Sequence, residues 1–140
     1  IGIDPDTDKS GFAFMHNGRV TLKTLRFFEL FKLLYQITKT PEYSDCKIEV
    51  YVECGFLNGG NRHFKAAAST EFNGKISERV GANHETAKKI REMCEFLKLE
   101  FHQVKPTRSK SNSEQFNKIT KISTKTNQEQ RDALMLIWGR

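Results

Sequence analysis

Cysteine is scarce in this 140-residue sequence, which contains three cysteines, and no two of them are spaced as C-x-x-C. An odd number of cysteines without that spacing argues against a disulfide framework and against a zinc knuckle. We therefore expect a fold that is held by an apolar core rather than by cross-links, in a reducing, cytoplasmic setting.

Long hydrophobic runs are absent as well. The densest apolar stretch, residues 27–35, is interrupted by Glu29 and Lys32, and it falls short of the ~18 residues that a membrane span needs. A chain of this length can bury roughly 68% of its unfolded surface, so we expect a single domain, residues 1–140, and no membrane partner. The sequence begins at Ile1 within what reads as a strand, so we expect further residues before it.

Positive charge exceeds negative charge, with 23 Lys and Arg against 17 Asp and Glu, and the excess is unevenly spread. Residues 59–91 carry 7 basic and 3 acidic side chains, and residues 105–126 carry 6 and 1. Two basic blocks of this kind suit a polyanion that is held against metal ions. On charge alone, an ordinary solvated basic face is an equally open interpretation.

Hydrophobic periodicity predicts a mixed sheet. Strands are expected at 1–4, 12–16, 20–25, 48–53 and 99–104, and helices at 27–37, 76–97, 114–122 and 128–138. Asn17-Gly18 favours a type I′ hairpin turn. Residues 55–74 contain four glycines and are expected to form a long connection, with Gly81 as a break or bend in the next helix. The order β-β-β-α-β-α-β-α predicts an α/β fold, a five-stranded mixed sheet with helices on both faces.

Four carboxylates stand out by their position in this pattern. Asp4 and Glu53 each end a predicted strand, and Glu129 and Asp132 lie three residues apart on one face of the last predicted helix. If the two strands are neighbours and the helix crosses their ends, the four side chains converge, and their repulsion requires protons or divalent cations. Oxygen ligands suit Mg²⁺ or Mn²⁺. Two such ions about 3.5–4 Å apart could hydrolyse a phosphodiester.

Other interpretations of acidic and histidine residues stay open. An Asp before Pro is usually a turn residue, and a Glu-x-x-Asp pair on a helix usually faces solvent. A calcium loop that starts at Asp4 fails, because its sixth position is Lys9 and its twelfth is Met15. Asp6 and Asp8 are interpreted as turn formers. The four histidines show no helix-spaced pair, and none is assigned to a metal.

Three motifs occur in order along the chain: I-G-I-D-P-D-T-D-K-S-G-F-A at its start, V-Y-V-E-C-G-F in the middle and E-Q-R-D-A-L-M-L-I-W near its end. Together they resemble the RuvC family of Holliday-junction resolvases, within the ribonuclease H-like superfamily. Asp4 and Glu53 take the family's first two acidic positions, and Glu129 and Asp132 those of its closing helix. Asp6 departs from the family's usual Gly, and Glu129 from its usual Asp.

The resemblance implies a ribonuclease H-like fold and a magnesium-dependent endonuclease that binds four-way DNA as a homodimer and nicks two strands, in recombination, repair or phage DNA processing. It makes the four carboxylates the catalytic and metal-binding residues, with two Mg²⁺ or Mn²⁺ ions. Phe56 would stack on or wedge between bases, or else anchor its own loop in the core. DNA contacts are expected from Phe56 and from seven basic residues, which would bind phosphates: Arg62, Lys65, Arg79, Lys105, Arg108, Lys110 and Lys118.

Three other functions compete with this one. Another ribonuclease H-like nuclease, acting on RNA, on other branched DNA or on transposon ends, would use the same carboxylates with a different binding surface. In a non-catalytic nucleic-acid-binding module the carboxylates would be structural. An actin-like ATPase would need a second phosphate loop and a longer chain, and Gly59-Gly60 alone is too weak a phosphate signal. No feature of the sequence indicates a helicase partner.

Overall fold

Strands and helices alternate along the computed structural model, which describes residues 1–58, 70–107 and 109–140, without the side chains of residues 70–73. The described elements are β1 (Gly2–Asp4), β2 (Ser10–His16), β3 (Arg19–Leu25), α1 (Phe27–Lys39), η1 (Pro41–Tyr43), β4 (Glu49–Glu53), η2 (Gly55–Leu57), α2 (Thr70–Phe96), β5 (Glu100–Val104), α3 (Ser113–Thr120) and α4 (Gln128–Met135). The predicted α/β class is confirmed. None of the described helices combines the length and the apolar character that a membrane span requires.

The five strands form one mixed sheet in the order β3-β2-β1-β4-β5. The first three strands are antiparallel neighbours, whereas β4 and β5 run parallel to β1. Asn17 and Gly18, between β2 and β3, have φ angles of 48° and 74°. Positive φ at both central residues is what a type I′ turn requires, so this prediction is confirmed. Because β1 and β4 are parallel neighbours, their carboxyl ends lie side by side at one end of the sheet.

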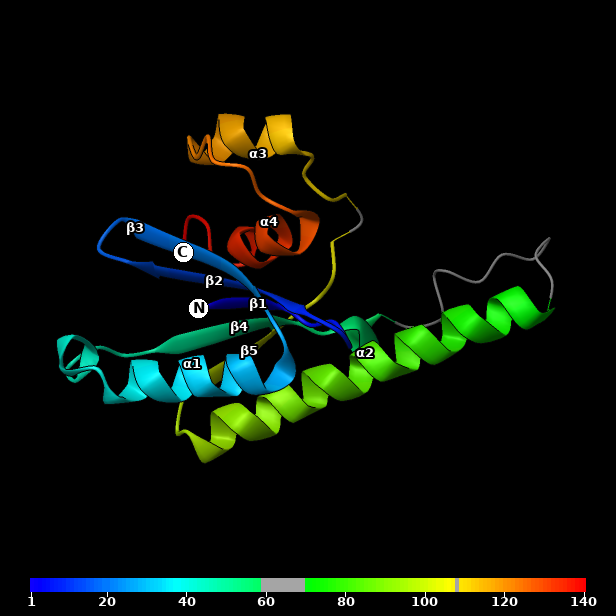
Figure 1. The fold of residues 1–140 in the computed structure, drawn as a ribbon, viewed down its shortest axis with the longest axis horizontal. Coiled ribbons are helices and arrows are strands. Elements are labelled where there is room, and N and C mark those ends of the chain that lie inside the picture. Colours follow the sequence, from blue (N-terminus) through cyan, green and yellow to red (C-terminus); the bar gives the residue numbers. More distant parts are fainter. Residues whose placement is uncertain (59–69, 108) are drawn as a thin grey trace.

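Helices cover both faces of the sheet, with α1 and α2 on one side and α3 and α4 on the other (Figure 1). Alternation along each strand divides the apolar side chains between two cores. One core lies between the sheet and the helices α1 and α2, and its buried side chains include those of Ile3, Phe12, Val50, Val52, Leu30, Leu34 and Ile90. The other lies between the sheet and α4, and its buried side chains include those of Ala13, Phe116, Ala133 and Leu134. The second core brings the last helix onto the sheet.

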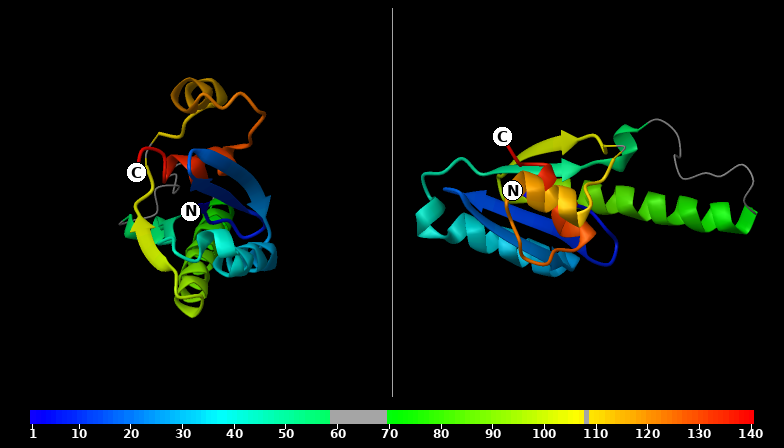
Figure 2. Two further views of the ribbon diagram at one scale, coloured as in Figure 1. Left: turned by 90° about the vertical axis from the view of Figure 1, so that its left-hand side faces the viewer. Right: turned by 90° about the horizontal axis from the view of Figure 1, so that it is seen from above.

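The helix α2 is longer than the sequence pattern predicts. It begins at Thr70, inside the segment expected to be a connection, and runs without a break through Gly74 and Gly81. A Cβ atom at either glycine would meet nothing within 4 Å, so both lie on open helix surface, where a glycine costs only about 1 kcal/mol relative to alanine. The first half of α2 extends past the sheet (Figures 1 and 2). The expected break at Gly81 is therefore wrong.

Candidate active site

Asp4 and Glu53 lie next to each other at the ends of two parallel strands. Asp4 is the last residue of β1 and Glu53 the last of β4, and the register pairs Gly2 with Tyr51 and Ile3 with Val52. The same register places Asp4 beside Glu53. Because alternate residues of a strand share a face, Asp4 shares the face of Gly2, which contacts α4. Both carboxylates therefore belong to the face that α4 covers.

Two glycines allow α4 to approach the sheet at backbone distance. A Cβ atom on Gly2 would lie 2.0 Å from the carbonyl oxygen of Ala133, and one on Gly11 would lie 2.0 Å from that of Glu129. Any side chain at either position would therefore push the helix away. The start of α4 is also fixed, because Asn127 donates from Nδ2 to Thr24 Oγ1 at 2.7 Å and accepts from the backbone N–H of Gln130.

This close approach brings Glu129 and Asp132 to the strand ends. Asp132 is buried, with a side chain that is 8% exposed, and both of its oxygens are bound. Lys110 Nζ donates to Oδ2 at 2.5 Å and Gln128 Nε2 donates to Oδ1 at 2.7 Å. The half-exposed side chain of Lys110 reaches the site from the loop after β5, so an ammonium group lies among the carboxylates.

The electrostatic coupling of these groups is visible in their pKa values. Burial, followed by the charges of Glu53, Asp132 and Glu129, raises the pKa of Asp4 to about 7, against the opposing charge of Lys110. Burial also raises the pKa of Glu53, which Lys110 opposes and Asp132 reinforces. For Lys110, burial lowers the pKa, but the hydrogen bond to Asp132 and the charges of Asp4, Asp132 and Glu53 outweigh it, so the pKa is raised.

We call Asp4, Glu53, Glu129 and Asp132 the carboxylate cluster. Its donor set consists only of carboxylate oxygens, which fits Mg²⁺ or Mn²⁺, and the raised pKa values of Asp4 and Glu53 reflect burial and neighbouring negative charge that Lys110 only partly offsets. No three of its ligand atoms lie within 4.8 Å of one another in the described part of the chain. Lys110 occupies one oxygen of Asp132, so cation binding would require Lys110 to withdraw.

Phe56 lies three residues after Glu53, in the short turn η2. Its half-buried ring packs against the core that α1 and α2 cover and meets the ring of His84 edge-on, with centroids 6.0 Å apart. This placement on the α1 and α2 side of the sheet fits the interpretation of Phe56 as a loop anchor. His84 further approaches Gly55, where a Cβ atom would lie 2.8 Å from its Nε2.

The predicted basic contacts are spread over several elements. Arg79 is exposed on α2 and lines a hollow with Thr7, whose backbone N–H donates to Asn83 Oδ1 at 3.2 Å. Lys105 is exposed after β5, and Lys118 is exposed in the last turn of α3. The structure brings only Lys110 of this group to the carboxylate cluster. Arg62, Lys65 and Arg108 lie outside the described residues.

Sequence reasoning missed the parts of this site that hold it together. Gly2, inside the predicted strand 1–4, and Gly11, directly before the predicted strand 12–16, were available as a signal, because small residues at such positions let another backbone approach closely. The role of Gln128 in holding Asp132 follows from an i, i+4 spacing on the last helix, which places the two side chains on one face.

The sheet order, the parallel β1-β4-β5 ladder and the last helix across the strand ends define a ribonuclease H-like fold. A solved structure with this fold is RuvC from T. thermophilus in complex with a Holliday junction substrate, which matches with a TM-score of 0.52 and 12% sequence identity over 96% of this chain and 87% of that one. The likeness to RuvC seen in the sequence motifs is thus confirmed at the level of the fold. No protein-family model and no curated protein matches the chain.

Proposed function

We propose that this chain is a metal-dependent, structure-selective endonuclease that hydrolyses phosphodiester bonds in four-way DNA junctions. The observation that carries the proposal is the electrostatic coupling of Asp4, Glu53 and Asp132 around the ammonium of Lys110. The fold, and the Holliday junction bound by its structural neighbour, support the same assignment. We assign residues 1–140 to one ribonuclease H-like nuclease domain of this kind.

In this proposal the carboxylate cluster holds two Mg²⁺ or Mn²⁺ ions. When bound, the ions would supply charge stabilisation and a water of lowered pKa. Asp4 and Glu53 offer their oxygens from the rigid strand ends, while Glu129 contributes through a longer side chain from α4. Lys110 neutralises Asp132 before the cations bind and then turns to a DNA phosphate, which its side chain can do because it is 54% exposed.

The DNA would lie across the carboxylate cluster. Phe56, three residues after Glu53, would stack on a base at the junction, and Arg79, Lys105 and Lys118 would contact phosphates without reading sequence. These contacts position the scissile bond, and the junction's shape decides which bond that is.

A homodimer is part of the same proposal. A four-way junction has approximate two-fold symmetry, so paired nicks are made most simply by a two-fold dimer whose sites face opposing strands. We propose the part of α2 that follows Lys75 as the interface. Light scattering with and without junction DNA tests this, and monomers alone under both conditions would contradict it.

A non-catalytic nucleic-acid-binding module is the second candidate, and one observation favours it. Both oxygens of Asp132 are already satisfied, by Lys110 and by Gln128. A protein that uses these carboxylates only to hold its fold would show the same pairing. Such a module would bind junctions equally well with EDTA and would never cut them.

A substrate panel tests the proposal. Labelled four-way junction, linear duplex of matched sequence and RNA–DNA hybrid are each incubated with the protein in Mg²⁺ and in EDTA. We expect nicking of the junction in Mg²⁺, little on linear duplex and none in EDTA. Cleavage of the hybrid alone would assign the protein to the RNA-directed nucleases, and binding without cleavage of any substrate would favour the non-catalytic module.

A further inference from the structure

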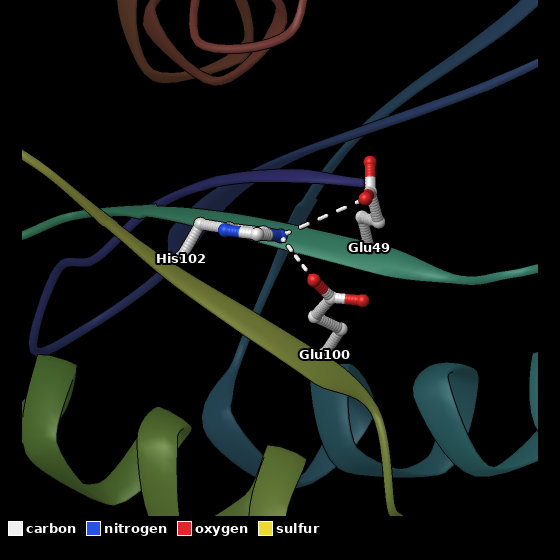
Figure 3. A group of neighbouring side chains, drawn as sticks. All are labelled: Glu49, Glu100 and His102. Atoms are coloured by element: carbon white, nitrogen blue, oxygen red, sulfur yellow. Dashed lines mark ion pairs between the residues drawn. The ribbon is translucent and has the colours of Figure 1, made fainter.

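A second group of side chains of types that bind metals lies at the beginning of β4 and β5, opposite the end of β4 that carries Glu53. Glu49 is the first residue of β4 and pairs in register with Glu100, the first residue of β5. His102 follows two residues later on the same face as Glu100. Its Nε2 lies 3.4 Å from Glu100 Oε1 and 3.8 Å from Glu49 Oε1 (Figure 3). One ligand atom from each of the three residues lies within 4.8 Å of the others.

The imidazole of His102 is held by ring stacking, but its Nε2 makes no hydrogen bond. Its ring stacks on Tyr51 with centroids 4.4 Å apart and an interplanar angle of 14°, and the Tyr51 hydroxyl donates to Glu49 Oε2 at 3.2 Å. Nε2 of His102 is buried and has no hydrogen-bond partner, which holds for no other buried side-chain nitrogen or oxygen in the described residues. A buried imidazole nitrogen that makes no hydrogen bond and faces two carboxylates is available as a metal ligand.

Lys47 supplies the positive charge that pairs with Glu49 and Glu100. Its Nζ lies 3.0 Å from Glu49 Oε1 and 2.8 Å from Glu100 Oε2, while its side chain is 68% exposed. An exposed lysine of this kind is held weakly and can turn into solvent. It pairs with the two carboxylates but leaves the imidazole nitrogen of His102 unsatisfied, so it satisfies only part of the group.

We propose that Glu49, Glu100 and His102 form a binding site for a divalent transition-metal cation of the Zn²⁺ type. Two carboxylates and one imidazole are a donor set that Zn²⁺ accepts, with a fourth position left for water. The imidazole selects against Mg²⁺, which takes oxygen ligands. The ion would tie β5, an edge strand of the sheet, to β4. Because an ion that binds only the folded state stabilises that state, we expect the bound ion to stabilise the fold.

This site is separate from the carboxylate cluster. Glu49 and Glu53 are four residues apart on one extended strand, which corresponds to about 13 Å. The proposal therefore does not rest on nuclease activity. Its test needs a background in which the carboxylate cluster cannot bind the probe, which the full-length Asp4→Asn/Asp132→Asn double variant provides.

Zn²⁺ titration of that double variant by calorimetry, together with Co²⁺ absorption in the visible range, tests the proposal. We expect one Zn²⁺ per chain and an intense Co²⁺ spectrum typical of tetrahedral coordination. Adding Glu100→Gln or His102→Gln should weaken Zn²⁺ binding by at least about tenfold and remove the Co²⁺ bands. Glu92→Gln is the matched control, because Glu92 is also an exposed glutamate paired with a lysine, but on α2. It should change neither signal.

Lys47→Met should change Zn²⁺ affinity in the direction opposite to Glu100→Gln and His102→Gln. Removing the ammonium that competes for the two carboxylates should tighten Zn²⁺ binding, whereas Lys88→Met, which removes an exposed lysine paired with Glu85 on α2, should not. Thermal unfolding in EDTA verifies that each variant is folded. The absence of saturable Zn²⁺ binding in the double variant, or binding that survives both Glu100→Gln and His102→Gln, would overturn the proposal.

Discussion

The two ends of β4 carry acidic side chains on the same face, yet their surroundings set them to different states. At its end, burial raises the pKa of Glu53, and burial together with the charge of Glu53 raises the pKa of Asp4, at the end of the adjacent strand β1, to about 7. At the beginning, the hydrogen bond from Lys47 lowers the pKa of Glu49, which lies near solvent. Desolvation and like charge dominate at one end, and ion pairing dominates at the other.

The difference lies in what covers each end. The helix α4 rests on Gly2 and Gly11 and buries Asp132, so burial and like charge act together on Asp4 and Glu53 at that end. At the other end Glu100 and Lys47 remain exposed, and the ligand set includes an imidazole. By our proposals, one sheet thus offers an oxygen-only site for Mg²⁺ or Mn²⁺ and a mixed site for a cation of the Zn²⁺ type.

The largest expected effect separates binding from chemistry at the carboxylate cluster. Asp4→Asn or Glu53→Gln keeps the size of the side chain but removes a charge that the cations need, so junction cleavage should fall by orders of magnitude. Glu129→Gln should show a smaller loss, because its longer side chain can act through a water. Affinity for the junction, measured by fluorescence anisotropy, should be retained or increased.

The controls for these variants come from the turn after β1. Asp6→Asn and Asp8→Asn should keep most of the activity, because Asp6 accepts the backbone N–H of Asp8 at 2.9 Å and shapes the turn. An equal loss in these controls would break the assignment of the chemistry to the strand ends.

The second effect is a pH dependence of stability without metal. The pKa of Asp4 is raised from 3.8 to about 7 in the folded state. The stability linked to its protonation is therefore fully present below the pKa of the unfolded chain and is lost as the pH rises towards 7. In EDTA the free energy of unfolding of Asp4→Asn, relative to wild type, should increase by up to about 4 kcal/mol between pH 4 and pH 8. Denaturant titration at several pH values measures it, and a difference that does not change with pH would contradict the account.

The third effect concerns the approach of α4. Gly11→Ala places a Cβ atom against the backbone of Glu129, so the helix must move, at a cost of about 3 kcal/mol in stability, and cleavage should fall with it. Gly81→Ala is the matched control on open helix surface and should stabilise by roughly 0.5–1 kcal/mol. Wild-type stability and cleavage in Gly11→Ala would show that the close contact is unnecessary.

The smallest effect tests the basic surface. The logarithm of junction affinity should fall linearly with the logarithm of salt concentration, with a slope of roughly −0.9 for each phosphate contact. Lys105→Ala and Lys118→Ala should each make the slope shallower by about that amount, and Lys88→Ala, on α2, should not. A slope near zero for wild type would remove the argument for an electrostatic DNA-binding surface.

Much of the fold could be predicted from the sequence, because its strongest signals are local. The alternation in β4, the Asn17-Gly18 turn and the apolar spacing in α1 each determine their own element. The start of α2 could not be predicted. Gly74 and Gly81 are typical helix breakers in a local pattern, yet in a helix of 27 residues the cost of each is small compared with the packing of its second half against the sheet.

The residues of the candidate site likewise include some that could be predicted from the sequence and some that could not. Asp4 and Glu53 could be predicted because each ends a strand, and Asp132 because it shares a helix face with Glu129. The pairing of Lys110 with Asp132 joins residues 22 positions apart across a polar loop, which no sequence period encodes. The group of Glu49, Glu100 and His102 depends on the register of β4 against β5, and a search for helix-spaced histidines does not detect it.

Single-turnover nicking of one labelled four-way junction in Mg²⁺ tests the central claim most directly, with wild type, Asp132→Asn and Glu100→Gln measured side by side. Asp132 belongs to the carboxylate cluster at the ends of β1 and β4, and Glu100 lies at the beginning of β5, at the opposite end of the sheet. The account predicts that Asp132→Asn binds the junction but nicks it orders of magnitude more slowly, while Glu100→Gln nicks it at the wild-type rate. Wild-type nicking by folded Asp132→Asn would contradict it.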